Sequence, residues 1–138
     1  MKALAALLLS AAPSLAQGYS DAQGGVVRWL DKLTNQTGDV ELQLGQSATN
    51  GRLTIQLDAC RYPSDNPAAE AEAHLTILDS TRDGPVFTGW MLASSPALSA
   101  LDHPRYDVWV LRCVVPGYEP PEVAPDAPDD ATTEGDGQ

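Results

Sequence analysis

Apolar and polar residues alternate along much of the middle of the chain, in short runs separated by turn-forming residues. The clearest run covers residues 53–58, where Leu or Ile alternates with Thr, Gln or Asp. Alternation with a period of two predicts a β-strand with one buried face and one exposed face. Similar apolar runs lie at residues 26–30, 40–44, 74–78, 86–92 and 106–115. We therefore expect about six short strands.

The segments between these runs contain turn-forming residues and one short helical pattern. Asp83-Gly84 is a strong turn signal, and Ser95-Pro96 suits a helix N-cap followed by proline at the first helical position. The run at 106–115 is apolar on both faces over residues 108–111, which predicts a central strand. Together these signals predict an all-β fold, a small antiparallel barrel or sandwich with one helical turn, and leave barrel and sandwich open.

The first sixteen residues have the pattern of a secretory signal peptide. Lys2 precedes an apolar run over residues 3–12, and small residues occupy positions 14 and 16. This predicts cleavage after Ala16 and export to the periplasm, because the apolar run is too short to span a bilayer. Polar and glycine-rich residues 17–25 predict a flexible arm ahead of a β domain over residues 26–115.

Residues 116–138 differ in composition from the rest of the chain. They contain five prolines, seven acidic residues and no Lys or Arg. Such a segment buries too little apolar surface to offset the entropy lost on folding, so we expect a disordered acidic tail. Its simplest role is to keep the protein soluble, and the alternative is an interaction tail for a basic partner or a cation.

The overall charge limits the classes of partner. The chain carries 8 Lys and Arg against 19 Asp and Glu, which gives a formal net charge of −11. This charge repels nucleic acids and anionic membrane surfaces. We therefore expect no nucleic-acid partner and, once the signal peptide is removed, no membrane span.

The two cysteines, Cys60 and Cys113, predict a disulfide if the protein is exported. In the chain-entropy description, a disulfide that closes the long loop between residues 60 and 113 stabilises a fold by roughly 4 kcal/mol. The alternative is a metal-binding or catalytic thiol. The cysteines lack the close spacing, to each other or to histidine, that is typical of a metal site.

One block resembles a known family. Residues 89–113, GWMLASSPALSALDHPRYDVWVLRC, are similar to a block typical of exported alphaproteobacterial proteins of domain of unknown function family 2155. Residues 30–37, 51–55 and 60–63 also resemble that family. The resemblance implies an exported bacterial protein and covers nearly all of the predicted β domain. It carries over no catalytic residue.

A hydrolase site can be built from residues in the same block. Ser94 or Ser95 would be the nucleophile and His103 the base, with Asp102 or Asp107 orienting the histidine. The serines lack the glycine-flanked surroundings of a nucleophile elbow, and the Ser-Pro step has a simpler role in starting a helical turn. We therefore expect no catalytic residue and no enzyme, and keep a weak hydrolase as an alternative.

Metal and cofactor sites have little support in the sequence. His74 and His103 are the two histidines, and neither belongs to a zinc-binding motif. The turn signals lack the run of oxygen ligands that forms a calcium loop. We expect no metal and no cofactor.

The aromatic residues suggest either a core or a partner surface. The three tryptophans lie on predicted strands and are expected in the core, where aromatic side chains supply much of the burial. Trp, Tyr and Arg are also the residues that concentrate at protein interfaces. If the disulfide forms, it ties two distant segments together, and the candidate partner surface then consists of Arg61, Tyr62, Trp90, Arg105, Tyr106 and Trp109.

The sequence therefore predicts an exported, non-enzymatic binding or accessory module for an envelope protein or complex. The alternative is a small-molecule or glycan-binding β-barrel. A binding barrel would show a pocket lined by aromatic and polar groups, whereas an interaction module would show an exposed patch.

Overall fold

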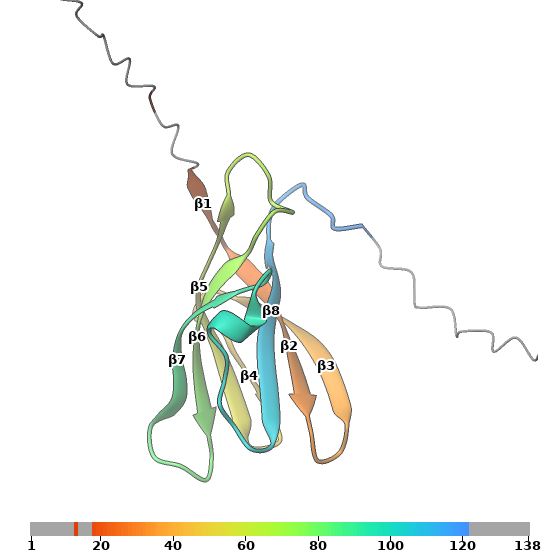
Figure 1. The fold of residues 1–138 in the computed structure, drawn as a ribbon, viewed down its shortest axis with the longest axis vertical. Helices are drawn as coiled ribbons and strands as arrows, with labels where there is room; N and C mark the ends of the chain where they lie inside the picture. The colour runs from red at the N-terminus through yellow and green to blue at the C-terminus, as the bar shows by residue number, and fades with distance from the viewer. Residues whose placement is uncertain (1–12, 14–17, 122–138) are drawn as a thin grey trace, which may run out of the picture.

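The computed structural model describes residue 13 and residues 18–121, which form an all-β fold (Figure 1). Eight strands and one short 3-10 helix follow one another along this part of the chain. The elements are β1 (Tyr19–Ala22), β2 (Gly24–Asp31), β3 (Gln36–Gln43), β4 (Ser47–Asn50), β5 (Leu53–Pro63), β6 (Glu72–Asp79), β7 (Pro85–Leu92), η1 (Pro96–Leu98) and β8 (Tyr106–Val114).

The strands form two sheets, and every pairing is antiparallel. The five-stranded sheet has the order β1-β5-β6-β7, with β4 also paired to β5. The three-stranded sheet has the order β3-β2-β8. The prediction of an antiparallel all-β fold is confirmed.

Both sheets contribute to one hydrophobic core. The period-two pattern of β5 and β6 places its apolar residues inward, where Leu57, Leu75 and Ile77 have no exposed surface. Val27, Leu42 and Val110 meet them from the three-stranded sheet. The polar residues of the same strands consequently lie on the outer face of the five-stranded sheet.

A disulfide joins the two sheets. The Sγ atoms of Cys60 on β5 and Cys113 on β8 are 2.03 Å apart, so the predicted bridge is confirmed. Gly25 on β2 lies beside this bridge, and a Cβ atom there would come within 3.1 Å of the Cys60 Sγ. A glycine at this position therefore lets β2 pass close to the disulfide.

The prediction of a flexible arm over residues 17–25 is wrong for residues 19–25. Tyr19–Ala22 form β1, which pairs with the end of β5, and β2 already begins at Gly24. The polar composition of β1 gave no strand signal, because its stability comes from the backbone ladder with β5 and from a hydroxyl pair between Ser20 and Ser64. The short strand β4, also polar, was missed for the same reason.

The prediction that β8 is a central strand is also wrong. Among the described strands, β8 pairs with β2 alone, so it lies at an edge of the three-stranded sheet, and β2 is the central strand. Val108 and Val110 face the core, whereas Trp109 and Leu111 are half-buried on the opposite face. Residues of the η1 segment lie beside Trp109, and this cover accounts for an apolar outer face on an edge strand.

The predicted helical turn is present as η1, with Pro96 at its first position. Ser95 precedes it but makes no capping hydrogen bond with its side chain, so that part of the prediction is wrong. The Asp83-Gly84 turn is confirmed by its place between β6 and β7, where Gly84 has a φ of 71°.

The predicted signal peptide, apart from residue 13, and residues 122–138 of the predicted tail lie outside the described residues. Residues 116–121 are described and contain no strand or helix. Among the described residues, no helix is long and apolar enough to cross a membrane.

Candidate functional site

The structure divides the predicted partner surface among separate places. Arg61 and Trp90 come together on the outer face of the five-stranded sheet. Tyr106 is the first residue of β8, directly after Arg105, whereas Cys113 lies near the end of the strand. Seven residues of strand place Tyr106 roughly 23 Å from Cys113. The disulfide therefore does not bring the two Arg-Tyr pairs into one surface.

The outer cluster is a group of polar and aromatic side chains on the outer face of β1, β5, β6 and β7. Its centre is Arg61, whose guanidinium carbon lies 4.3 Å from the centroid of the Trp90 ring and 5.6 Å from that of Tyr19. The Arg61 Nε donates to Glu72 at 2.6 Å. The strand ladder produces this contact, because Arg61 and Glu72 are cross-strand partners. The outer cluster consists of Tyr19, Asp58, Arg61, Glu72, His74 and Trp90.

The second half of the outer cluster is built on the histidine. His74 lies opposite Trp90 in the β6–β7 ladder, and the two rings meet edge to face with centroids 5.3 Å apart. Its Nδ1 donates to the Asp58 carboxylate at 2.9 Å. Burial raises the pKa of Asp58, but hydrogen bonds from Thr76, His74 and Gln56 outweigh burial and lower it below its ordinary value. The charged form of Asp58 therefore holds the histidine against the tryptophan.

The outer cluster remains accessible to a partner. Trp90 is 36% exposed and Tyr19 is 49% exposed, although tryptophan was expected in the core. Trp29 does pack against the core, over Gly38 of β3, so the core prediction is right for Trp29 and wrong for Trp90. Exposed Trp, Tyr and Arg held in fixed orientations have the composition of an interface hot spot.

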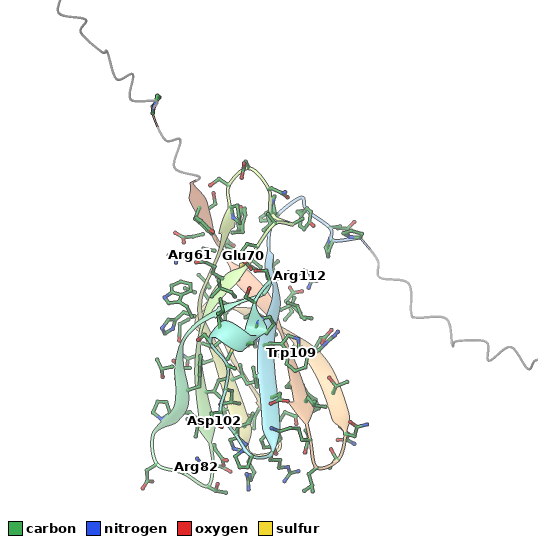
Figure 2. The ribbon with its side chains drawn as sticks, viewed as in Figure 1. Arg61, Glu70, Arg82, Asp102, Trp109 and Arg112 are labelled. Atoms are coloured by element: carbon green, nitrogen blue, oxygen red, sulfur yellow. A yellow bond between two sulfur atoms is a disulfide. The ribbon has the colours of Figure 1, made fainter. Side chains whose placement is uncertain are left out.

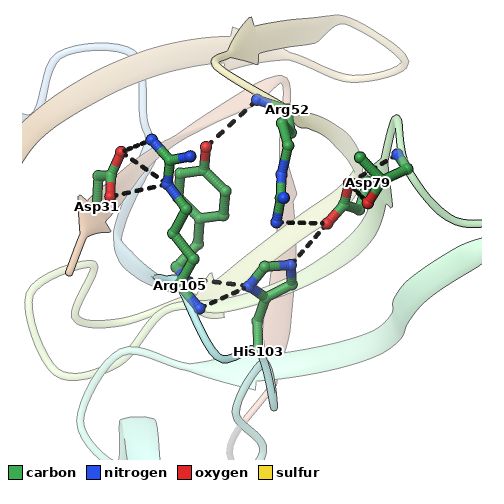
Figure 3. A network of polar contacts seen from close by, with 7 residues as sticks. Asp31, Arg52, Asp79, His103 and Arg105 are labelled. Carbon is green, nitrogen blue, oxygen red and sulfur yellow. Dashed lines mark hydrogen bonds and ion pairs between the residues drawn. The ribbon is translucent and has the colours of Figure 1, made fainter. Parts of the chain in front are cut away.

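The buried network lies at the other end of the two sheets and consists of Asp31, Arg52, Asp79, His103, Arg105 and Tyr106 (Figure 3). His103, which is 3% exposed, accepts the backbone N–H groups of Arg105 and Tyr106 at its Nδ1. Its Nε2 donates to the Asp79 carboxylate at 2.8 Å. Because Nδ1 accepts two hydrogen bonds, the ring is the neutral tautomer with its proton on Nε2.

Two carboxylates anchor this network. Hydrogen bonds from the Thr81 backbone and from the His103 and Thr81 side chains hold the pKa of Asp79 well below its ordinary value. Asp79 also pairs with Arg52 at 3.2 Å. A bidentate Arg105 guanidinium lowers the pKa of Asp31 to about 2. Both carboxylates are buried and paired, so their geometry serves to fix the β2, β6 and β8 ends.

The predicted hydrolase residues do not form a site. The Ser94 hydroxyl donates to Glu70, and both ring nitrogens of His103 are engaged in the buried network. Figure 2 labels Glu70 towards one end of the sheets and Asp102, the neighbour of His103, towards the other. Because the serine and the histidine lie far apart, the serine-histidine hypothesis has no geometric basis. The broader prediction that the protein is not an enzyme stays a prediction.

Glu70 has a structural role beside a surface hollow of about 320 Å³. Burial raises its pKa, but hydrogen bonds from the Ser94 side chain and from the backbone of Ser94, Ala71 and Ala93 lower it below its ordinary value. These bonds tie the β5–β6 connection to the residues after β7. The carboxylate is thus occupied by the protein's own donors.

The two remaining predicted surface residues lie apart from the outer cluster. Tyr62 is half-buried against the core. Trp109 lines a hollow of about 220 Å³ on the three-stranded sheet, together with Pro96, Ala97 and Leu101. Within residues 18–121, no group of three or more His, Cys, Asp or Glu residues is arranged to hold a metal ion. The absence of a metal or cofactor stays a prediction.

A family comparison covers most of the described chain. The family model "Uncharacterized protein conserved in bacteria (DUF2155)" matches residues 25–113, which include the disulfide and most residues of both clusters. The chain belongs to this family. The resemblance found in the sequence is therefore confirmed, and the matched range begins at the second residue of β2 and ends at Cys113.

A curated relative supports this membership. The chain is 26% identical over 98 residues to the "Uncharacterized protein RP359" of Rickettsia prowazekii (strain Madrid E). The match covers 69% of this chain and 63% of the relative, so the chain spans less than two thirds of the relative's length. No solved structure matches the chain.

Sequence reasoning missed four members of the outer cluster: Tyr19, Asp58, Glu72 and His74. A usable signal was present in residues 71–77, where Ala, Leu and Ile alternate with Glu72, His74 and Thr76. This alternation places the three polar residues on one outer face. The contact with Arg61 and Trp90 depends on the order of β5, β6 and β7, which the alternation alone does not reveal.

Proposed function

We propose that this protein is an exported accessory module that binds an envelope protein through the outer cluster. The observation that carries the proposal is the stack of Arg61 between Trp90 and Tyr19, on an accessible sheet face. Two aromatic rings and Glu72 orient the guanidinium before any partner arrives. Such preorganisation lowers the entropy lost on binding.

Charge suggests the kind of surface that the partner presents. The outer cluster contains the carboxylates of Asp58 and Glu72 against the single guanidinium of Arg61, and Asp21 is the cross-strand neighbour of Arg61 on β1. The whole chain carries a net charge of −11. A partner with a basic contact region is therefore favoured by electrostatic complementarity. Export and an envelope location rest on the signal-peptide pattern of residues 1–16.

Crosslinking capture from the native envelope tests this proposal. The mature chain is compared with Arg61→Ala and Trp90→Ala, and Trp109→Ala is the matched control because Trp109 lies on the other sheet. We expect both outer-cluster variants to weaken binding of the purified captured partner at least tenfold and the control to leave it unchanged. Equal affinity in all four proteins contradicts the proposed surface.

A truncated chain separates the folded domain from the acidic segment. The proposal predicts that a chain lacking residues 122–138 still captures the partner, because the outer cluster lies entirely within residues 18–121. Loss of capture on truncation makes the acidic segment the binding element. If no protein is captured by any form, the accessory-module proposal fails, and glycans and small molecules become the next ligands to test.

A further inference from the structure

The free edge of β7 differs from the other sheet edges of this protein. Within residues 18–121, β7 pairs with β6 alone, so one side of its backbone faces away from the five-stranded sheet. In Figure 1 it forms an outer border of the fold. Among the described residues, the backbone groups of residues 87–91 make no hydrogen bond to any segment other than β6. The η1 segment and β8 approach β7 without pairing to it.

The composition of this edge lacks the features that prevent strand association. Residues 87–92, FTGWML, contain no charge and no proline, and Thr88 and Trp90 are exposed. Folded proteins usually protect a sheet edge with charged residues, proline, a bulge or short length. Here Pro85 and the register shift near Leu78 protect only the N-terminal end of β7.

The other edges of the same protein carry such protection. β3 has Asp39 and Glu41, and β8 has Asp107 and Arg112. The two strands at the opposite edge of the five-stranded sheet, β1 and β4, are four residues long each. Among the described edge strands, β7 alone is long and lacks both charge and proline over residues 87–92. The contrast indicates that this edge is kept free for pairing.

We infer that β7 is the docking edge for an extended segment of the partner, which adds as a further strand to the five-stranded sheet. The inference rests on the proposed function and specifies how the partner binds. Backbone hydrogen bonds would supply affinity, and the outward side chains of the added strand would lie beside Trp90 and so beside the Arg61 stack. Thus the uncharged edge and the outer cluster form one continuous site.

The occupant is a partner protein rather than a second copy of this chain. Two copies that each carry a net charge of −11 repel one another, whereas a basic segment is attracted to the net negative charge of the chain and meets the carboxylates of Asp58 and Glu72 beside Trp90. Nucleic acid is disfavoured by the same charge.

Site-specific photocrosslinking in the full chain, expressed in its own envelope, tests the inference. The photoreactive residue benzoylphenylalanine replaces Thr88 on the β7 edge, Ser47 on the opposite edge of the same sheet, or Gln56 on its outer face. All three positions are exposed. We expect position 88 to capture one segment of one partner and position 47 to capture none.

Amide hydrogen exchange with the purified captured partner then distinguishes strand addition from packing on the sheet face. Half of the β7 amides already point to β6, so an added strand protects the alternate ones. We expect these alternate amides to exchange at least tenfold more slowly in the complex, with no change in β3. Thr88→Lys should weaken binding at least tenfold, and Ser47→Lys should not, with circular dichroism confirming that both variants fold.

Each contrary result has a distinct meaning. A partner captured from position 56 but not from position 88, or unchanged β7 amide exchange, overturns strand addition and leaves the proposed function standing. A product with the mass of two copies overturns the inference in favour of self-association. No partner from any position overturns the proposed function and the inference together.

Discussion

The outer cluster and the buried network contain nearly the same types of side chain but differ in their role. Each contains a histidine paired with an aspartate, an arginine beside an aromatic ring, and a second acidic residue. In the buried network, His103 and Asp79 have fully buried side chains. In the outer cluster, His74 and Asp58 each retain 27% of their side-chain exposure.

This difference in burial changes what the same chemistry contributes. A buried polar group that loses its partner bears the full cost of desolvation, so breaking the pair of His103 and Asp79 destabilises the fold. An exposed group exchanges its partner for water at little cost. The outer cluster is therefore free to give up contacts to a partner, and the buried network is not.

The largest expected effect is on the covalent link between the sheets. The double variant Cys60→Ala/Cys113→Ala removes the bridge beside Arg61 and should lower the free energy of unfolding by about 4 kcal/mol. The bridge restricts the unfolded chain, so its loss affects stability more than any single contact in either cluster. Urea unfolding of the variant and the oxidised wild type measures the effect. A loss below about 1 kcal/mol contradicts this view.

Matched substitutions of the two histidines test the comparison directly. His103→Ala removes one of the hydrogen bonds to Asp79 and leaves two buried backbone N–H groups without a partner, and should lower the free energy of unfolding by about 3 kcal/mol. His74→Ala should cost less than about 1 kcal/mol, because water replaces the ring beside Asp58. Similar losses in the two variants, measured by urea unfolding, would show that burial does not separate the clusters.

Acid should weaken the buried network within a defined pH range. The pKa of Asp31 falls from 3.8 to about 2 on folding, so the unfolded chain takes up a proton first as the pH is lowered. Stability from this group is complete above pH 3.8 and is lost as the pH falls towards 2. Asp79, whose pKa is also lowered, acts in the same direction.

Unfolding curves between pH 6 and pH 2 measure this loss. The variant Asp31→Asn should be less stable than the wild type at pH 6 and should lose less stability on acidification, because one titrating group is gone. A variant whose pH dependence equals that of the wild type assigns the acid sensitivity to other carboxylates.

A similarly small effect on stability is expected at the centre of the outer cluster. Arg61→Ala removes a partly exposed ion pair and two cation–π contacts, and should lower the free energy of unfolding by about 1 kcal/mol or less. The same variant should lose partner binding at least tenfold. Loss of stability well above this range would make Arg61 a structural residue and remove the contrast between the two clusters.

Most of the fold was predictable because its signals are local. The alternation in β5 and β6, the Asp83-Gly84 turn and the paired cysteines each depend on neighbouring residues or on one possible pairing. β1 and β4 escaped prediction because polar strands depend on the backbone of β5. The edge position of β8 was not predicted, because residues of the η1 segment cover its outer face. The strand is therefore apolar on both faces, as a central strand would be.

The candidate site was predicted only in part. Composition singled out Arg61 and Trp90, which do meet, but also Arg105 and Tyr106, which belong to the buried network. The two groups have the same residue types, and residue type does not reveal burial. The disulfide was predicted correctly, yet it connects the far end of β8 and leaves the two Arg-Tyr pairs apart.

Local patterns and residue counts were enough to predict the all-β class, the disulfide and the acidic charge, and the resemblance of four sequence blocks identified the family. Which aromatic and charged residues share a surface depends on the tertiary arrangement of the strands. Strand order places Trp90 within reach of Arg61 across β6, and burial gives His103 and His74 opposite roles. Strand order and burial arise from contacts between distant segments, which no local pattern records.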